Sequence, residues 1–267
     1  MTAARDMTPL LTVENLVAGY GDQTVLDGVS LTANVGEILV VLGATGSGKS
    51  TLLRCLVGLV QPRSGRVLIR GRDITHASRT EREAILRDVG LAFQDAALLN
   101  SMTAAENVAL PIVEHWHVDE PTALMLARMR LASVGLAGAG EKMPSELSGG
   151  MRKRAGIARA MALEPPLLLL DEPSAGLDPT TARALDELIL GFKARGNMGV
   201  VCVTHELGSI NTIADRAVML ARGHVIASGT LEEVRATPDE RVRAFFERQL
   251  VHGEKRASVA DELAWTK

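Results

Sequence analysis

The sequence predicts an α/β fold in which a mostly parallel β-sheet is covered by helices. Short apolar runs of strand length alternate with segments of helical periodicity, which is typical of a parallel sheet with helices around it. The first two predicted strands are joined by a short turn, which indicates an antiparallel β edge. The stretch from about 95 to 162 has helical patterns and no strand pattern. We therefore expect an inserted helical subdomain at about 95–162.

Length and composition are those of an ordinary globular protein. The chain has 267 residues, of which 46% are hydrophobic and 23% charged, with a formal net charge of −3. This charge provides no global field that would attract nucleic acid, so we expect no nucleic-acid partner. Cys55 and Cys202 lie in apolar stretches, which favours buried free thiols over a disulfide. We expect a single domain over 1–250 and a polar tail over 251–267, a candidate segment for docking on a partner.

The N-terminus lacks a signal-peptide pattern, and no apolar run approaches the ~20 residues that span a bilayer. If the protein acts at a membrane, other chains must bring it there.

The elements of the N-terminal half follow from apolar runs and glycine turns. The run 37–42 is almost entirely apolar, which is typical of a strand buried on both faces. A glycine-rich turn follows it and leads into a predicted helix over 49–60. The predicted strands of this half are 11–17, 25–31, 37–42, 66–70 and 89–93.

The C-terminal half is organised by helix-start signals. Asp119 and Pro121 begin a predicted helix that Gly135 ends, and a second helix follows Gly150. Asp178 is the expected N-cap of a later helix. Strands are predicted at 167–170, 200–204, 217–221 and 224–227, the last two as a hairpin.

Two capping-box patterns close the domain. They pair Thr230 with Glu233 and Thr237 with Glu240, and a last helix is expected to run to about 250.

One glycine-rich segment has the full pattern of a phosphate-binding P-loop. It follows a predicted buried strand and opens a helix, as that loop requires. Its backbone N–H groups would surround phosphate oxygens, Lys49 would reach the β- and γ-phosphates, and the Ser50 hydroxyl would ligate Mg²⁺. A purely structural turn with a lysine at its end is improbable when every position matches. The expected ATP contacts are Gly43, Ala44, Thr45, Gly46, Ser47, Gly48, Lys49, Ser50 and Thr51.

Polar residues end three predicted strands and indicate the reacting end of the site. Asp171 would hold Mg²⁺, and Glu172 would polarise the attacking water. His205 would contact the γ-phosphate, and Gln94 would bridge Mg²⁺ and the water. Each of these four alone is more often structural, and the P-loop upstream is what favours the catalytic interpretation.

Two further features indicate nucleotide contacts. Tyr20, the single tyrosine of the chain, lies upstream of the P-loop, where its ring could stack on adenine. Ser148, Gly149 and Gly150 open a helix and form a second anion-binding helix start. This second start lies in the helical insertion, away from the P-loop. Both starts can contact one nucleotide only if they come from different subunits.

The order of these motifs resembles the ATP-binding cassette (ABC) family over nearly the whole chain. The motifs are, in order, Tyr20, the P-loop, Gln94, Ser148-Gly149-Gly150, Asp171-Glu172, Asp178 and His205. The resemblance implies a P-loop NTPase with a RecA-like core and an inserted helical subdomain. It also implies a head-to-tail dimer with ATP and Mg²⁺ between the subunits, in which Ser148, Gly149, Gly150 and Asp178 act in trans.

A finer resemblance is to the ATPases of MCE-associated lipid transporters, the group that includes the Mla phospholipid system. It rests on three segments, 94–111, 143–151 and 238–245, and on Met151 where the signature usually ends in glutamine. The loop over 174–178 instead resembles the broad family, which leaves the lipid subgroup open. Leu98, Leu99 and Met102 either line a groove for a permease helix or belong to the core of the insertion.

The resemblance implies a role in transport at the cytoplasmic face of the inner membrane. The implied partners are permease subunits, an MCE-type lipid-binding protein and a small accessory subunit. Two alternatives stay open: an importer ATPase for a polar solute such as an amino acid, and an ABC ATPase outside transport, such as one for iron–sulfur assembly.

Overall fold

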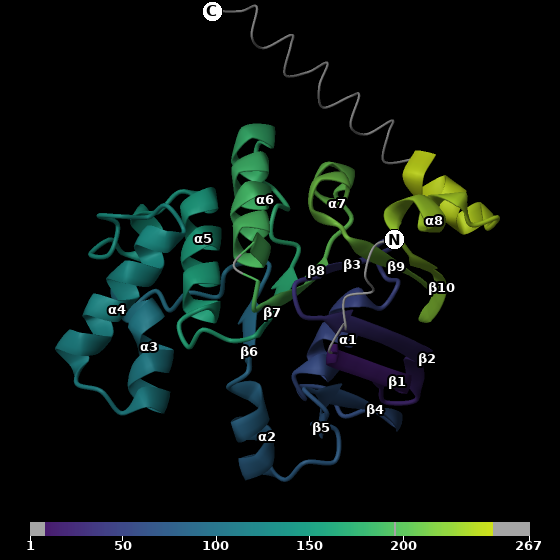
Figure 1. Ribbon diagram of the computed structural model, residues 1–267, viewed down its shortest axis with the longest axis horizontal. Helices are drawn as coiled ribbons and strands as arrows, with labels where there is room; N and C mark the ends of the chain where they lie inside the picture. Colours follow the sequence, from purple (N-terminus) through teal and green to yellow (C-terminus); the bar gives the residue numbers. More distant parts are fainter. Residues whose placement is uncertain (1–8, 195, 248–267) are drawn as a thin grey trace, which may run out of the picture.

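The computed structural model describes residues 9–194 and 196–247, which form two β-sheets with helices packed around them (Figure 1). The larger sheet has six strands in the order β10-β9-β3-β8-β7-β6, and the smaller has four in the order β2-β1-β4-β5. The strands of the larger sheet are β3 (Ile38–Leu42), β6 (Val89–Ala92), β7 (Leu167–Asp171), β8 (Gly199–Val203), β9 (Arg216–Ala221) and β10 (His224–Gly229).

The three central strands of the larger sheet run parallel and are buried on both faces. β3 pairs with both β8 and β9, and β7 pairs with both β6 and β8, all in parallel. Alternate residues of β3 lie in different core clusters: Val40 packs with the helices that cover one face, while Val41 packs with α1 (Lys49–Leu56) and the smaller sheet on the other. This two-sided burial explains why the sequence of each strand is a continuous apolar run.

The smaller sheet is antiparallel, as predicted for the first strands. A two-residue turn joins β1 (Pro9–Tyr20) to β2 (Gln23–Asn34), and both strands are longer than the sequence pattern indicates. β1 also pairs antiparallel with β4 (Ser64–Ile69), which pairs with the short β5 (Arg72–Asp73). These strands form a sheet of their own, while the predicted hairpin of β9 and β10 supplies the antiparallel edge of the larger sheet.

Every regular element between β6 and β7 is helical, as the sequence predicts. The predicted helix after Asp119 is α4 (Glu120–Ser133), with Asp119 as N-cap, and the helix after Ser148 is α5 (Gly149–Ala160). The sequence analysis did not place α2 (Arg79–Leu86), which precedes this region, or α3 (Ala104–Trp116) within it. Three further elements are η1 (Pro144–Glu146), α6 (Pro179–Ala194) and α7 (Leu207–Ile213).

Two sequence-based predictions about helix ends are wrong. α1 ends at Leu56 and not near residue 60, because Gly58 has φ of +69° and breaks the helix. The pattern at Thr237 is not a capping box, since its hydroxyl donates to the Glu233 carbonyl, while Asp239 accepts from Arg241 N and precedes helical residues 240–247.

The other capping box is confirmed: Thr230 and Glu233 cap α8 (Leu231–Ala236). The predicted end of the last helix and the tail over 251–267 lie outside the described residues.

Cys55 and Cys202 are buried free thiols, as predicted. Within the part of the chain that the structure describes, no helix is both long and apolar enough to cross a membrane.

We expect Asn107→Leu to lower the free energy of unfolding by about 3 kcal/mol, because it removes the four hydrogen bonds between this buried side chain and the backbone. Asn107 is fully buried in α3; its side chain accepts from Leu99 N and donates to the carbonyls of Leu99, Met102 and Thr103. Urea denaturation measures the change, with the exposed Asn100→Leu as matched control. Equal losses in both variants would contradict this role for Asn107.

Candidate active site

The predicted P-loop connects the buried strand β3 to helix α1. Two of its glycines are required by close contacts as well as by positive φ angles. A Cβ at Gly43 would lie 2.3 Å from the Leu220 carbonyl oxygen, and one at Gly48 would lie 2.7 Å from a methyl of Leu26. The loop is therefore pressed against β9 and β2, which fixes where its backbone N–H groups lie.

Lys49 begins α1 and bends back over the loop. Its buried ammonium donates to the carbonyls of Gly43 at 2.7 Å and Ala44 at 3.2 Å. Burial lowers the pKa of Lys49, while the nearby carboxylates of Glu172 and Asp171 oppose that shift. Phosphate oxygens would give this cation stronger, charge-assisted partners than two carbonyls do.

Asp171 and Glu172 lie at the carboxyl end of β7. Asp171 Oδ1 is buried and, among the described residues, has no hydrogen-bond partner. Burial raises the pKa of Asp171, the neighbouring Glu172 carboxylate adds to the shift, and Lys49 opposes it. A buried carboxylate oxygen with an unused lone pair suits a ligand that carries positive charge.

Glu172 has a strained backbone and is held from three directions. Its φ of +44° is unusual for a residue with a side chain. Its Oε1 lies 2.8 Å from Nδ1 of His205, its backbone N–H donates to Val203 O, and its carbonyl accepts from Nζ of Lys153 at 3.0 Å. The carboxylate is thereby placed next to His205, beyond the ends of two parallel strands.

Most of these groups converge on one cleft. It has a volume of about 340 Å³ and is open to solvent. Of the predicted site residues it brings together most of the P-loop with the strand-end residues Gln94, Glu172 and His205, while Asp171 does not line it. Its lining is Val25, Thr45, Gly46, Gly48, Lys49, Ser50, Thr51, Gln94, Glu172 and His205.

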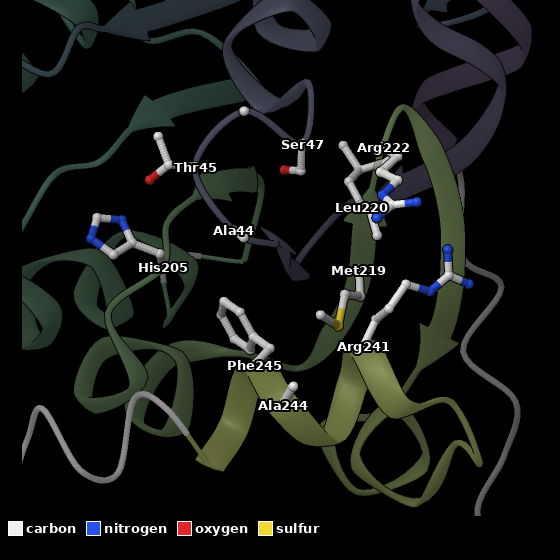
Figure 2. Close-up of a pocket in the computed structure, with 12 residues that line it drawn as sticks. Ala44, Thr45, Ser47, His205, Met219, Leu220, Arg222, Arg241, Ala244 and Phe245 are labelled. Carbon is white, nitrogen blue, oxygen red and sulfur yellow. The ribbon is translucent and has the colours of Figure 1, made fainter.

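A second pocket, of about 570 Å³, adjoins the same loop and was not predicted (Figure 2). P-loop residues Ala44, Thr45 and Ser47 border it together with His205. Its remaining lining comes from β9, the turn after it and helical residues 240–247, namely Met219, Leu220, Ala221, Arg222, Arg241, Ala244 and Phe245. The P-loop therefore faces open space on two sides.

Tyr20 lies outside the cleft, at the end of β1. Its ring is 45% exposed, and its hydroxyl accepts from Arg54 Nη1 at 3.0 Å. That hydrogen bond is the main cause of a lowered pKa for Tyr20. Because Arg54 belongs to the helix that Lys49 begins, the exposed ring is held beside α1.

The second anion-binding helix start lies apart from the cleft, as expected. Ser148 caps α5 by accepting from Met151 N at 3.2 Å, and the described cleft includes neither it nor Gly149, Gly150 or Asp178. Asp178 caps α6, accepting from the backbone of Thr180 and Thr181. A Cβ on Gly150 would lie 2.6 Å from Thr181, so the two helix starts pack closely. In Figure 1, α5 and α1 lie on opposite sides of α6.

The family model for "ABC transporter" matches residues 26–175, which is more than half of the chain. The chain belongs to the ABC transporter family. It is an ABC ATPase, and this confirms the prediction from the order of its motifs.

Similar proteins support the same assignment. The chain is 39% identical over 236 residues to the intermembrane phospholipid transport system ATP-binding protein MlaF of Haemophilus influenzae, covering 88% of this chain and 89% of that protein. It is also 39% identical over 233 residues to the probable ribonucleotide transport ATP-binding protein mkl of Mycobacterium tuberculosis. That match covers 87% of this chain but 65% of mkl, so this chain spans about two thirds of it.

Solved ABC cassettes share the fold. The dimeric post-hydrolysis state of the cassette MJ0796, bound to ADP and Pi, is 30% identical with a TM-score of 0.76; it matches 83% of this chain and 98% of that structure. A nucleotide-free cassette from an ABC transporter is 29% identical with a TM-score of 0.78, covering 89% and 98%. The fold of a P-loop ABC ATPase is therefore established for this chain.

Two residues near the ABC ATPase cleft have contacts that the sequence analysis did not predict. Lys153 of α5 donates a hydrogen bond to the carbonyl of Glu172. Val25 of β2 lines the cleft although it is an ordinary strand residue in the sequence. The sequence shows that Lys153 lies near the start of the helix that Ser148 caps. The group that its ammonium contacts depends on how α5 packs against β7.

The His205–Glu172 pair should make the stability of this ABC ATPase depend on pH. The hydrogen bond to Glu172 raises the pKa of His205 above its usual value, against an opposing effect of burial. Protonated His205 therefore stabilises the fold below about pH 6.5, and the stabilisation disappears as the pH rises through the folded-state pKa. We expect His205→Ala to cost roughly 0.5–1 kcal/mol more at about pH 5.5 than at about pH 9, because the pair is partly exposed. Urea denaturation at both pH values tests this, and an equal cost would contradict it.

Proposed function

We propose that this ABC ATPase powers phospholipid transport as a head-to-tail dimer bound to a separate membrane permease. The observation that carries the lipid assignment is the match to MlaF, named for intermembrane phospholipid transport, over nearly the full length of both chains. The segments 94–111, 143–151 and 238–245, with Met151 after the signature glycines, support it. We place the chain at the cytoplasmic face of the inner membrane, with an MCE-type lipid-binding protein and a small accessory subunit as further partners.

Within the proposed mechanism, Glu172 orients the attacking water and accepts its proton. His205 lies 2.8 Å from the carboxylate, where it can hold Glu172 and contact the γ-phosphate. Gln94 lines the same cleft and can position the water from the other side. Lys49 and the P-loop backbone bind the phosphates, and the exposed Tyr20 ring offers a surface for adenine.

The residues present fit Mg²⁺. The unpartnered, buried Oδ1 of Asp171, the Ser50 hydroxyl and the Gln94 amide are hard oxygen ligands, which this ion prefers. Among the described residues, no group of three or more His, Cys, Asp or Glu side chains could hold a metal ion. When bound, Mg²⁺ would neutralise charge on the β- and γ-phosphate oxygens.

The proposed dimer joins two half-sites. The described cleft is lined by most of the P-loop and by Gln94, Glu172 and His205 at the strand ends. Outside it lie Ser148, Gly149, Gly150 and Asp178, most of them exposed. A second copy placed head to tail would bring its α5 start over this P-loop. The similar cassette MJ0796, a dimer in its post-hydrolysis state with ADP and Pi, supports a dimer for this chain.

The proposed permease contact lies next to Gln94. Phe93 and Leu99 are 42% and 43% exposed, and Asn107 fixes the backbone from Leu99 to Thr103. An apolar surface on a fixed backbone suits a short helix of a partner. Leu98 instead packs partly against the core, which is the other role considered for these residues.

A ribonucleotide or another polar solute is the second candidate, because mkl matches with the same identity. To separate the two, the chain is tagged and purified from its native host with its membrane partners. Phospholipid bound to the co-purified permease, and ATPase activity stimulated by phospholipid, are expected. Stimulation by a polar solute and not by phospholipid would overturn the lipid assignment, and co-purification with soluble scaffold proteins alone would overturn transport.

A further inference from the structure

A second contact joins the ends of β7 and β8, beside the one between Glu172 and His205. Ser174 lies two residues after Glu172, and Ser209 lies in α7, four residues after His205. Their hydroxyl oxygens are 2.9 Å apart, and both side chains are buried. The segment that leaves Glu172 is therefore tied to the helix that follows His205.

Asp186 of α6 extends this contact into the protein interior. It is 3% exposed, its carboxylate accepts a hydrogen bond from the Ser209 side chain, and its Oδ1 has no partner among the described residues. Burial raises the pKa of Asp186 to about 6, so the carboxyl is mostly ionised at neutral pH. Burial raises the pKa of the Cys202 thiol on β8, and the carboxylates of Glu172 and Asp186 add to that shift.

An ionised carboxylate gives the chain of hydrogen bonds a direction. A carboxylate only accepts, and each serine hydroxyl has a single proton to donate. Ser209 must therefore donate to Asp186, which leaves its oxygen to accept from Ser174. A neutral side chain at position 186 that can also donate would remove this preference and allow Ser209 to turn.

Hydrogen bonds anchor both ends of the loop over 174–178 to α6. Asp178 caps the helix through the N–H groups of Thr180 and Thr181, and Ser174 reaches Asp186, two turns further along, through Ser209. α6 and α7 lie next to each other beyond the strand ends (Figure 1). This arrangement restricts how far the segment after Glu172 can move.

We propose that Asp186 is a positioning residue for ATP hydrolysis, which orders Ser209 and Ser174 and so holds the Glu172 carboxylate against His205. Asp186 does not line the cleft, so it acts through the two serines. The proposal rests on the proposed role of Glu172 as the base. It predicts a change in the rate of the chemical step and not in the binding of ATP.

The test is steady-state ATPase kinetics of the full-length chain. We expect Asp186→Asn, which is nearly the same size, to lower kcat about 10-fold because the base loses its alignment, with KM for ATP within about 2-fold. Ser174→Ala should give a similar loss, and the double variant should be no slower than either single one, because both break one network. Ser209→Thr, which keeps the hydroxyl, should retain more activity than Ser209→Ala.

Two controls separate the possible outcomes. Thr75→Val removes a buried hydroxyl beside the smaller sheet, where Thr75 accepts from Val67 N at 2.8 Å. A kcat near the wild-type value in Asp186→Asn, an equal loss in Thr75→Val, or losses that multiply in the double variant would overturn the proposal. Glu172→Gln is measured in parallel: if it loses activity while Asp186→Asn does not, only the positioning role fails, and if it keeps activity, the assignment of the base fails.

Discussion

Glu172→Gln is expected to lower the ATPase rate by about 100- to 10,000-fold, the usual contribution of a general base. The amide cannot accept the proton of the attacking water, yet it has the size of the carboxylate and can still pair with His205. The P-loop contacts are untouched, because Lys49 is held by the carbonyls of Gly43 and Ala44. ATP should therefore bind normally and remain unhydrolysed, and the closed dimer should accumulate.

Phosphate release measures the rate, nucleotide binding is measured separately, and size-exclusion chromatography with ATP and Mg²⁺ reports the dimer. Glu187→Gln is the matched control, since it makes the same change at an exposed position of α6. Turnover close to that of the control would show that Glu172 is not the base, and loss of ATP binding would show that the variant acts on the phosphate site instead.

The residues of the cleft are predictable because their patterns are local. The P-loop is recognised from eight consecutive residues between a buried strand and a helix, and Asp171 and Glu172 from a run of leucines that ends in acids. In a parallel sheet such strand ends meet at one edge. The structure places Gln94, Glu172 and His205 around the P-loop in this way.

The sequence analysis failed where a local pattern conflicts with the surroundings. α3 contains Pro111 in its interior and is apolar on several sides, so it lacks the helical periodicity of a surface helix. Its start has a capping box between Thr103 and Glu106, a pattern that is present in the sequence. Thr237 shows the reverse case, because a matching pattern there does not start a helix.

Other features depend on contacts between distant segments. β1 pairs with β4 across about fifty residues, which makes a separate sheet where the local pattern indicates an edge. No local pattern distinguishes Asp186 from the other residues of α6. Only the packing of α7 shows that its carboxyl is buried beside Ser209. Long-range pairing and buried polar networks of this kind have no sequence pattern that identifies them.

Ser148→Arg is expected to abolish ATP hydrolysis without weakening nucleotide binding to the monomer. Ser148 is exposed at the start of α5, apart from the cleft of its own chain, so an arginine there leaves the P-loop unchanged. In the proposed dimer the bulky side chain would enter the one nucleotide site of the partner that Ser148 faces and disable that site. Ser148→Ala measures the lost N-cap, about 1 kcal/mol, and Ser145→Arg, three residues earlier and also exposed, is the matched control.

Mixing two inactive variants tests the shared site directly. Lys49→Ala disables the P-loop half and Ser148→Arg disables the α5 half, but a heterodimer of the two contains one site with both halves intact. Random pairing of equal amounts makes about half of the dimers mixed, so roughly a quarter of wild-type activity should return. A site built within one chain offers no such rescue, because each chain keeps its own defect. Absence of recovery in a mixture shown to contain heterodimers, or full hydrolysis by a monomer, would exclude the composite site.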